Sequence, residues 1–330
     1  MRHERQLLEA LDPRRLHLIV LPTEQCNFRC VYCYEDFAIG RMAPATVRAI
    51  KSLIDSRIDE LSDLLISWFG GEPLLAYDIV VEIMSLIRDR ARPGLNSFSD
   101  ITTNAARLTP ERLENLISLG VTNYQVSLDG LAASHDKKRV LANGAGTFDR
   151  VWGNLCKARE VDGDFSMTVR SHVDRDNLAE MPEYIKVFAE TFGDDPRFTL
   201  YLRQVSRLGG PNDALLPVLA GDSDAMERLR EMARGYGLTL FSLDRDEYVC
   251  YAAKPNSFVI RANGQIGKCT VGFASAKNKI GTLRDDGTLD LDNAKIRHWA
   301  RGFESGVQGQ LLCPATAAMS ESLQAAIATG

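Results

Sequence analysis

Short apolar runs alternate with segments of helical periodicity through the first two thirds of the chain. Residues 17–21 and 64–69 are mostly apolar, which is typical of strands buried within a sheet. After Pro44, apolar residues recur at intervals of three and four positions, and this spacing predicts an amphipathic helix. The pattern therefore opens with a strand, a helix and a second strand.

The alternation of strand and helix patterns continues to about residue 205. We expect further strands at residues 97–103, 123–128, 165–172 and 197–205, and helices at residues 78–90, 109–119, 148–160 and 177–191. Strands separated by helices imply a parallel sheet with right-handed crossovers. Six such units predict an α/β fold, a partial (β/α)6 TIM-like barrel that stays open, with its chemistry at the carboxyl ends of the strands.

The regular alternation ends near residue 210. A polar helix is expected near residues 223–234, and Asn263-Gly264 between two apolar runs predicts a hairpin because both residues tolerate positive φ. We expect four parts: an N-terminal extension at residues 1–15, the barrel at residues 16–210, a linking helical segment at residues 211–247 and a small α+β domain at residues 248–330.

The charge distribution argues against several classes of partner. The formal net charge is −5, and Lys and Arg are interspersed with acidic residues, so no basic stripe for nucleic acid is expected. No apolar run reaches the length of a membrane span, and residues 1–15 lack the apolar core of a signal peptide. We therefore expect a cytoplasmic protein that binds neither nucleic acid nor a membrane.

Three of the seven cysteines fall within eight residues, a density typical of metal ligation in a reducing compartment. Cys26, Cys30 and Cys33 follow the first expected strand, which places them on a loop. Their thiolates suit three corners of an iron–sulfur cube and leave the fourth iron open. The alternative is zinc, which needs a fourth Cys or His close by, and the sequence has none nearby.

This cysteine spacing, with the aromatic Tyr32 before the last cysteine, resembles the signature of the radical S-adenosylmethionine (SAM) superfamily. The resemblance implies a 4Fe-4S cluster on Cys26, Cys30 and Cys33 whose open iron is chelated by the amine and carboxylate of SAM. Reductive cleavage of SAM would then give a 5′-deoxyadenosyl radical that abstracts hydrogen from a substrate. Tyr32 would lie near the adenine.

Further motifs at the expected strand ends resemble the SAM contacts of the same superfamily. Gly70-Gly71-Glu72 resembles the motif that receives the SAM ammonium, although a glycine pair alone is merely a turn. The remaining cofactor-binding candidates are Asn104 at the rim, Ser127 and Asp129 near the ribose, and Arg139 and Arg170 facing the carboxylate. The alternative for Arg139 and Arg170 is a structural ion pair, and the alternative for Asn104 is that it only caps its own turn.

The C-terminal part resembles a SPASM/twitch-like domain, which in the superfamily holds auxiliary clusters. Cys250 and Cys269 match its opening, but Gln310 stands where a cysteine would precede Cys313. Cys250, Cys269 and Cys313 are candidates for one auxiliary 4Fe-4S cluster with an open or non-cysteine fourth site. The alternative is a degenerate site with three structural cysteines. Cys156 lies on a helical pattern and is expected to be a small buried thiol.

Within this subgroup, the resemblance implies an oxidoreductase-type enzyme that crosslinks or oxidises a ribosomally synthesised precursor peptide. Its expected partners are the peptide and an electron donor such as flavodoxin or ferredoxin, and either a separate leader-binding protein or the barrel itself would recognise the leader. Two other enzymatic readings are a small-molecule dehydrogenase or rearrangement enzyme and a maturase that oxidises a protein residue. A cluster-assembly or regulatory protein is a further alternative. No individual catalytic residue is singled out.

Overall fold

The computed structural model describes residues 2–219, 223–241 and 248–317. The described residues form two compact units, each built from segments that are distant in sequence. The first unit comprises residues 2–25, 37–99 and 248–317, and the second comprises residues 26–36 and 100–241 with its gap at 220–222. The strand β4 (Asn96–Thr103) is divided between them.

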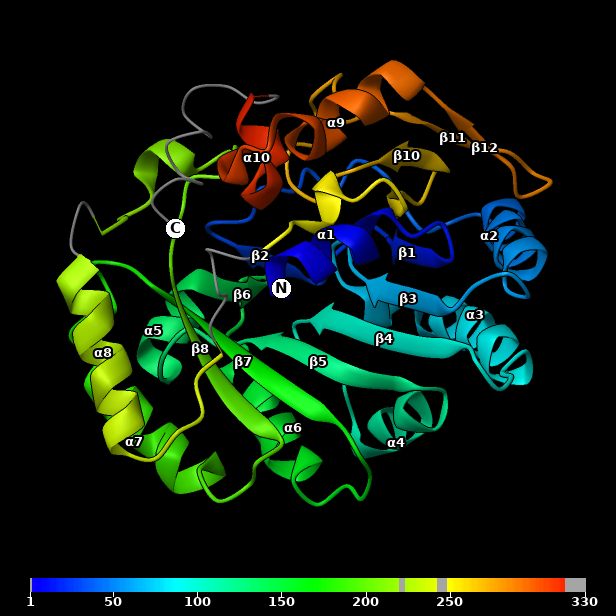
Figure 1. Cartoon of the computed structure of the whole chain (residues 1–330). Coiled ribbons are helices and arrows are strands. Elements are labelled where there is room, and N and C mark those ends of the chain that lie inside the picture. The colour runs from blue at the N-terminus through cyan, green and yellow to red at the C-terminus, as the bar shows by residue number, and fades with distance from the viewer. Residues whose placement is uncertain (1, 220–222, 242–247, 318–330) are drawn as a thin grey trace. The chain divides into compact units, whose positions relative to one another are not determined.

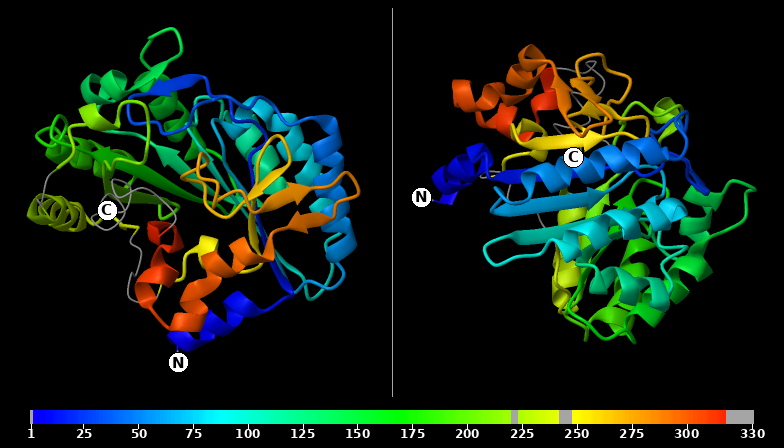
Figure 2. Two further views of the ribbon diagram at one scale, coloured as in Figure 1. Left: turned by 90° about the horizontal axis from the view of Figure 1, so that it is seen from above. Right: turned by 90° about the vertical axis from the view of Figure 1, so that its right-hand side faces the viewer.

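In the first unit, strands follow the order β12-β11-β10-β9-β1-β3 (Figure 1). β1 pairs in parallel with β3 and β9, so segments far apart in sequence become neighbours, whereas β9 to β12 pair antiparallel (Figure 2). The strands are β1 (Arg15–Val20), β3 (Asp63–Trp68), β9 (Ser257–Ile260), β10 (Gln265–Gly267), β11 (Gly281–Leu283) and β12 (Leu289–Leu291). The helices are α1 (Arg2–Leu11), α2 (Pro44–Arg57), η1 (Pro73–Ala76), α3 (Tyr77–Asp89), η3 (Tyr251–Ala253), α9 (Asn293–Ser305), α10 (Gln308–Leu312) and η4 (Pro314–Ala317).

Apolar burial explains these first-unit elements. Leu18 and Val20 of β1 are fully buried, as the apolar run predicts. In α2, Pro44 occupies the first turn, where its missing N–H is not needed, and Ile50 and Ile54 lie in the core. Each such buried aliphatic side chain contributes about 1.5–3 kcal/mol relative to an exposed one.

In the second unit, β5, β7 and β8 pair in parallel, while the short strands β2 and β6 pair antiparallel. α4 packs against β5, and α8 packs against β8 (Figure 1). The strands are β2 (Phe28–Cys30), β5 (Val121–Ser127), β6 (Arg139–Leu141), β7 (Ser166–Val173) and β8 (Phe198–Gln204). The helices are α4 (Pro110–Ser118), α5 (Ala132–Lys138), α6 (Phe148–Ala158), α7 (Met181–Phe192), η2 (Asp213–Leu215) and α8 (Ser223–Gly235).

Every strand and helix expected up to residue 205 is present, with ends displaced by four residues or fewer. Three expectations are corrected. The cysteine segment is not wholly a loop, because Phe28–Cys30 forms β2. In the hairpin turn, only Gly264 adopts positive φ, at 80°, since the connection is longer than two residues. Cys156 is partly exposed rather than buried.

The expected division at residues 15, 210 and 247 remains a prediction, and residues 220–222, 242–247 and 318–330 within it lie outside the described part. Across the residues that are described, no helix combines the length and apolar character required to cross a bilayer.

Candidate functional site

The first cysteine cluster lies in the second unit and is shaped by close backbone contacts. Cys33 N–H donates to the Cys30 carbonyl at 3.1 Å, and Phe28 N–H donates to Cys26 Sγ at 3.3 Å. Gly210 passes so near that a β-carbon there would lie 2.5 Å from the Cys33 carbonyl oxygen. All seven cysteines are thiols, with no disulfide between them.

The strand pair β2–β6 places Cys30 directly opposite Arg139. Burial raises the pKa of the Cys30 thiol, while the Arg139 charge acts in the opposite direction. Burial likewise raises the pKa of Cys33 to about 11. Thiolates at these partly buried positions therefore depend on positive charge from a bound cation or metal.

The donor geometry bears on the choice between zinc and a cluster. Within the described residues, no three His, Cys, Asp or Glu side chains converge on a single metal ion. A zinc ion requires that convergence, whereas a four-iron cube takes one thiolate on each of its irons. The choice between zinc and a cluster on these three thiols therefore stays a prediction from the sequence.

Asp129 is the centre of a buried hydrogen-bond network in this unit. Its carboxylate is fully buried and accepts hydrogen bonds from the His172 N–H at 2.9 Å, His172 Nδ1 at 3.1 Å and the Tyr32 hydroxyl. Arg139 Nη1 donates to the Tyr32 oxygen at 2.6 Å. Burial opposes ionisation of Asp129, but His172 and Arg139 outweigh it and lower its pKa. Asp129 is therefore a carboxylate that orients Tyr32 and, through it, Arg139.

Tyr32 lies against His172, with ring centroids 4.7 Å apart and planes inclined by 44°. Burial lowers the pKa of His172 to about 4, so its ring is neutral at pH 7 and donates from Nδ1 to Asp129. Burial also raises the pKa of Tyr32 well above its usual value, which keeps the phenol protonated as a donor. The role of Tyr32 beside an adenine remains a prediction.

Arg139 and Arg170 each present a buried donor that the protein leaves without an acceptor. Arg170 Nη2 donates to Ser127 Oγ at 3.0 Å, yet Nε of both arginines is buried and has no hydrogen-bond partner in the described structure. Neither guanidinium forms an ion pair with a carboxylate among the described residues, so the ion-pair alternative is not supported. Buried Nε donors that have no acceptor among the described residues fit an anionic ligand such as the SAM carboxylate.

Asn104 both caps its turn and contacts the cysteine segment. Its Oδ1 accepts from the Ala106 N–H at 3.0 Å, as the turn alternative predicts. Its Nδ2 donates to Asn27 Oδ1 at 3.0 Å and approaches Cys26 Sγ at 3.8 Å. The amide of Asn104 therefore ties the end of β4 to the first cysteine.

The glycine motif belongs to the first unit and packs against the residues that precede Cys26 in the chain. Gly70 has φ of 112°. A β-carbon on Gly71 would lie 2.4 Å from the Gln25 carbonyl oxygen, which also accepts from the Glu72 N–H at 3.0 Å. Glu72 is fully buried, and its Oε1 accepts from the Leu74 N–H at 3.0 Å. This contact requires glycine at position 71.

We expect Gly71→Ala to lower the free energy of unfolding by about 1–3 kcal/mol, because its methyl group overlaps the Gln25 backbone. Chemical denaturation measures the change. Gly153→Ala is the matched control, since Gly153 lies inside α6 with open space around its missing β-carbon. Alanine there should be neutral or stabilising. Equal losses from both variants would contradict the close-packing argument.

His135 accepts a hydrogen bond from the Asp129 backbone as a neutral ring. The Asp129 N–H donates to His135 Nδ1 at 3.2 Å. Thr147 Oγ1 lies 3.0 Å from His135 Nε2 and donates its own proton to the Arg139 carbonyl, so Nε2 must carry the ring proton. Burial lowers the pKa of His135 to about 4. The ring therefore links the backbones of Asp129 and Arg139.

His135 makes stability depend on pH. The unfolded histidine binds a proton near pH 6.5 and the folded one only near pH 4, so stability falls as the pH is lowered through this window. The loss from this one group is on the order of 3 kcal/mol. The amide of Gln can replace both hydrogen bonds but does not titrate. We therefore expect His135→Gln to lower the slope of unfolding free energy against pH by the amount that corresponds to about one bound proton. Unchanged slopes in denaturation series from pH 7 to 4 would contradict this assignment.

The second cysteine set lies in the first unit. The Cys250 N–H donates to the Leu311 carbonyl at 2.9 Å, two residues before Cys313. Cys269 Sγ accepts from the Val271 N–H at 3.4 Å, and each of the three thiols lies within electrostatic range of the others. Burial raises the pKa of Cys250 to about 11 and that of Cys269 to about 12. The backbone of Cys250 is therefore in contact with the segment that leads to Cys313, and the auxiliary ligand set stays a prediction.

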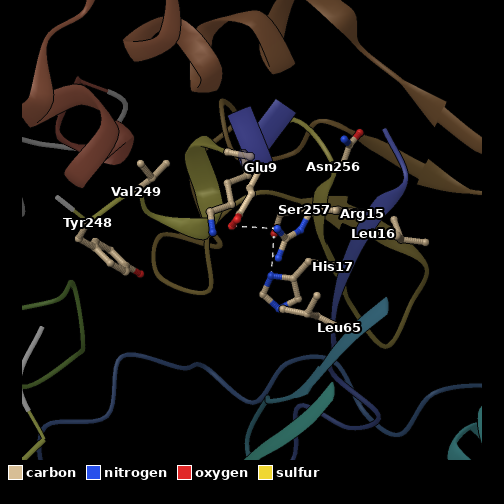
Figure 3. A pocket seen from close by; sticks show the side chains of 11 residues that line it. Glu9, Arg15, Leu16, His17, Leu65, Tyr248, Val249, Asn256 and Ser257 are labelled. Carbon is tan, nitrogen blue, oxygen red and sulfur yellow. Dashed lines mark hydrogen bonds and ion pairs between the residues drawn. The ribbon is translucent and has the colours of Figure 1, made fainter. Parts of the chain in front are cut away.

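A cavity of about 260 Å³ opens in the first unit at the amino end of β1 (Figure 3). Glu9 and Arg15 form a 3.0 Å ion pair across it, and His17 bonds Ser257 at 3.3 Å. Gly70 lies beyond the carboxyl end of the neighbouring strand β3. This cavity is therefore at the wrong end of the strands for the expected chemistry.

Sequence reasoning assigned His172 no partner in the Asp129 network and did not predict the buried ion pair Glu24–Arg261. The strict two-residue alternation of burial along β7 puts His172 on the same face as Arg170, and that period was available in the sequence. Glu24 and Arg261 form a buried two-bond ion pair, with Nε to Oε1 at 3.1 Å. They are 237 residues apart, and no local pattern connects them.

Comparison with known families gives one match. Residues 20–188, about half of the chain, match the family described as the radical SAM superfamily. The matched segment includes the first three cysteines, Gly70-Gly71-Glu72 and Arg170.

Two curated relatives illustrate the range of named activities. The PqqA peptide cyclase of Bradyrhizobium diazoefficiens is 26% identical over 244 residues, which cover 71% of this chain and 58% of the relative. The GTP 3′,8-cyclase of Marinobacter nauticus is 34% identical over 140 residues, covering 42% and 39%. The chain thus spans less than two thirds of the length of either relative.

Solved structures share the fold. A structure of anSMEcpe with bound AdoMet has a TM-score of 0.67 at 18% identity, covering 86% of this chain and 80% of that one. Streptococcus suis SuiB bound to precursor peptide SuiA has a TM-score of 0.56 at 18% identity, covering 81% and 62%. These likenesses confirm the expected α/β fold of the partial-barrel type.

Proposed function

Because the chain belongs to the radical SAM superfamily, we propose that Cys26, Cys30 and Cys33 hold a 4Fe-4S cluster at which SAM is bound and reductively cleaved. Members of this superfamily use that cluster together with SAM. When bound, the two groups supply a 5′-deoxyadenosyl radical for hydrogen abstraction. The main supporting observation is that Arg139 and Arg170, which belong to the same unit as the cysteine segment, each have a buried Nε with no acceptor among the described residues.

In this proposal, the residues of the chain bind SAM, orient it and exclude water from the site. Asp129 fixes the Tyr32 hydroxyl, which in turn holds Arg139 through its Nη1 and leaves Nε to donate to the SAM carboxylate. Ser127 holds Arg170 in the same way. We assign the ribose contact to Ser127 and Asp129, and the ammonium contact to Gly70, Gly71 and Glu72. Asn104 positions Cys26.

We propose a ribosomally synthesised peptide as the substrate. Two relatives support this choice: one is named a PqqA peptide cyclase, and SuiB was solved with its precursor peptide SuiA. The 5′-deoxyadenosyl radical would take one hydrogen atom from an unactivated carbon, and formation of the crosslink or oxidised residue would release one proton to solvent and one electron to the proposed auxiliary cluster. Flavodoxin or ferredoxin would supply the electron, and a separate protein would present the leader segment.

A small-molecule substrate is the second candidate. It is favoured by the 34% identity to a GTP 3′,8-cyclase over 140 residues, a higher identity over a shorter segment than the peptide cyclase gives. A maturase that oxidises a protein residue belongs with the peptide proposal, because both substrates present a polypeptide backbone.

We propose, further, that Cys250, Cys269 and Cys313 hold one auxiliary 4Fe-4S cluster with a fourth site that is not a cysteine. Packing of Cys250 against the Leu311 backbone and mutual electrostatic influence of the three thiols support the assignment. Gln310, which stands where the missing cysteine would be, donates no thiolate, and its Oε1 accepts from Ser305 Oγ at 2.9 Å.

The test uses anaerobically reconstituted protein with SAM and dithionite, with and without short peptides encoded beside its gene. We expect 5′-deoxyadenosine in all samples, increased by the true peptide, whose mass falls by two hydrogen atoms per crosslink. GTP and related nucleotides serve as the comparison substrates. Absence of 5′-deoxyadenosine would refute the superfamily chemistry, whereas its formation without any peptide change would refute the peptide assignment.

A further inference from the structure

Arg203 lies near the carboxyl end of β8, on the face of that strand which carries its polar side chains. Buried and partly exposed residues alternate along β8, and the partly exposed ones before its last residue are Thr199, Tyr201 and Arg203. The ring of Phe198, on the buried face, stacks on Phe192 of α7 with centroids 4.8 Å apart. Arg203 therefore lies on the face of β8 that does not pack against α7.

The same face of the neighbouring strand β7 carries Arg170 and His172. The two strands pair in parallel, with Thr168 opposite Thr199 and His172 opposite Arg203. Thr168 Oγ1 lies 3.1 Å from Thr199 Oγ1, so side chains that are in register share a face. Because paired strands are about 4.8 Å apart, Arg203 is the direct neighbour of His172 across the sheet.

His172 connects this face to the cysteine segment. Its ring centroid lies 4.7 Å from that of Tyr32, which belongs to that segment, and its Nδ1 donates to the Asp129 carboxylate at 3.1 Å. Arg203 thus lies one strand beyond residues of the SAM site, on the same face and within the same unit. A substrate that adjoins SAM on this face can therefore contact Arg203.

The guanidinium of Arg203 has a neutral partner and no counter-charge. Its Nη1 donates to the Tyr201 hydroxyl at 3.2 Å, and within the described part of the chain no carboxylate pairs with it. The Asp129 carboxylate already serves the buried network, and we assign the SAM carboxylate to Arg139 and Arg170. The remaining N–H groups of Arg203 are thus left for one further planar anion.

We propose that Arg203 binds the carboxylate of an Asp or Glu side chain in the substrate peptide and so determines which peptides are accepted. This inference rests on the proposed peptide substrate. A carboxylate suits the position better than a nucleotide triphosphate, because one guanidinium forms two parallel hydrogen bonds with a carboxylate but supplies a single charge against several. Tyr201 is a positioning residue, whose hydroxyl holds the guanidinium without neutralising it.

The experiment uses full-length, anaerobically reconstituted enzyme and fluorescently labelled short peptides encoded beside its gene. Each peptide is made in its natural form and with single replacements of Asp by Asn or Glu by Gln. Fluorescence anisotropy reports peptide binding independently of SAM cleavage. We expect Arg203→Gln to weaken binding of the natural peptide about 10- to 100-fold and to leave the affinity for SAM unchanged.

One of the amide replacements in the peptide should weaken binding to the wild-type enzyme by a similar factor. The same replacement should have little further effect on the Arg203→Gln enzyme, because the two changes remove one shared interaction. This lack of additivity identifies the acidic residue that Arg203 contacts and would not arise from a merely structural role.

Two further variants make the test selective. Tyr201→Phe keeps the guanidinium but removes the hydroxyl that orients it, so we expect a loss of about three- to tenfold that depends on the same acidic residue. This variant guards against misfolding of Arg203→Gln. Arg230→Gln is the matched control, because Arg230 of α8 lines a small cavity with Leu202 on the opposite face of β8. Its loss should leave peptide binding unchanged.

The outcomes separate this inference from the proposed function. Undiminished binding of every amide peptide, or equal losses in Arg203→Gln and Arg230→Gln, overturns the inference and leaves the proposed function intact. SAM cleavage without binding of any peptide overturns the inference together with the peptide assignment. Binding that depends on Arg203 in an enzyme that forms no 5′-deoxyadenosine would support the inference and refute the proposed radical chemistry.

Discussion

Replacing Cys26, Cys30 and Cys33 together by alanine is expected to abolish formation of 5′-deoxyadenosine, with a loss of at least about a thousandfold. Without thiolates, the site has no soft ligands to hold iron, and SAM has no open iron to chelate. The iron content should fall by about four atoms per chain. Chromatographic assay of 5′-deoxyadenosine and a colorimetric iron count, on protein reconstituted in parallel with wild type, measure both effects.

Cys156→Ala is the control for loss of a thiol. Cys156 lies on α6, is partly exposed and takes no part in either cysteine set. Both its iron content and its SAM cleavage should match wild type. If the triple variant still cleaved SAM at the wild-type rate, the assignment of the cluster to these three residues would be wrong.

Asp129→Asn is expected to weaken SAM binding by about 10- to 100-fold, the usual effect of removing a group that orients direct ligands. The substitution removes the negative charge beside Tyr32 and Arg139 and puts an amide donor where the carboxylate accepted from Tyr32 or His172. Stability should fall by on the order of 3 kcal/mol, because buried donors lose their acceptor. Calorimetric titration with SAM and chemical denaturation measure the two quantities separately.

Asp174→Asn separates the role of Asp129 in the site from its role in folding. Asp174 is a buried carboxylate of the same unit, but it pairs with Lys138 Nζ at 2.5 Å and caps the turn at Asn177. Removing its charge should cost about 3–5 kcal/mol of stability and leave the affinity for SAM unchanged. Comparable loss of affinity in both variants would mean that Asp129 acts only through the fold.

Local patterns of apolar residues predicted much of the core. The apolar run at residues 17–21 and the three- and four-residue spacing after Pro44 each reflect a face that must be buried, so β1 and α2 formed where expected. Two short strands were not predicted by these patterns. Phe28–Cys30 and Arg139–Leu141 are too short to show a period, and they are strands only because they pair with each other.

The sequence by itself determined the chemistry available to this protein. Three thiols in eight residues, a glycine pair after the second strand and the order of strands and helices are local properties, because ligand spacing and side-chain periodicity are set by covalent neighbours. Tertiary structure alone decided how buried charges are used. It placed Cys30 opposite Arg139 and the Tyr32 hydroxyl against the Asp129 carboxylate, and within the described residues it pairs neither Arg170 nor Lys268 with a carboxylate. These outcomes depend on desolvation and on contacts between residues far apart in the chain, which no local pattern encodes.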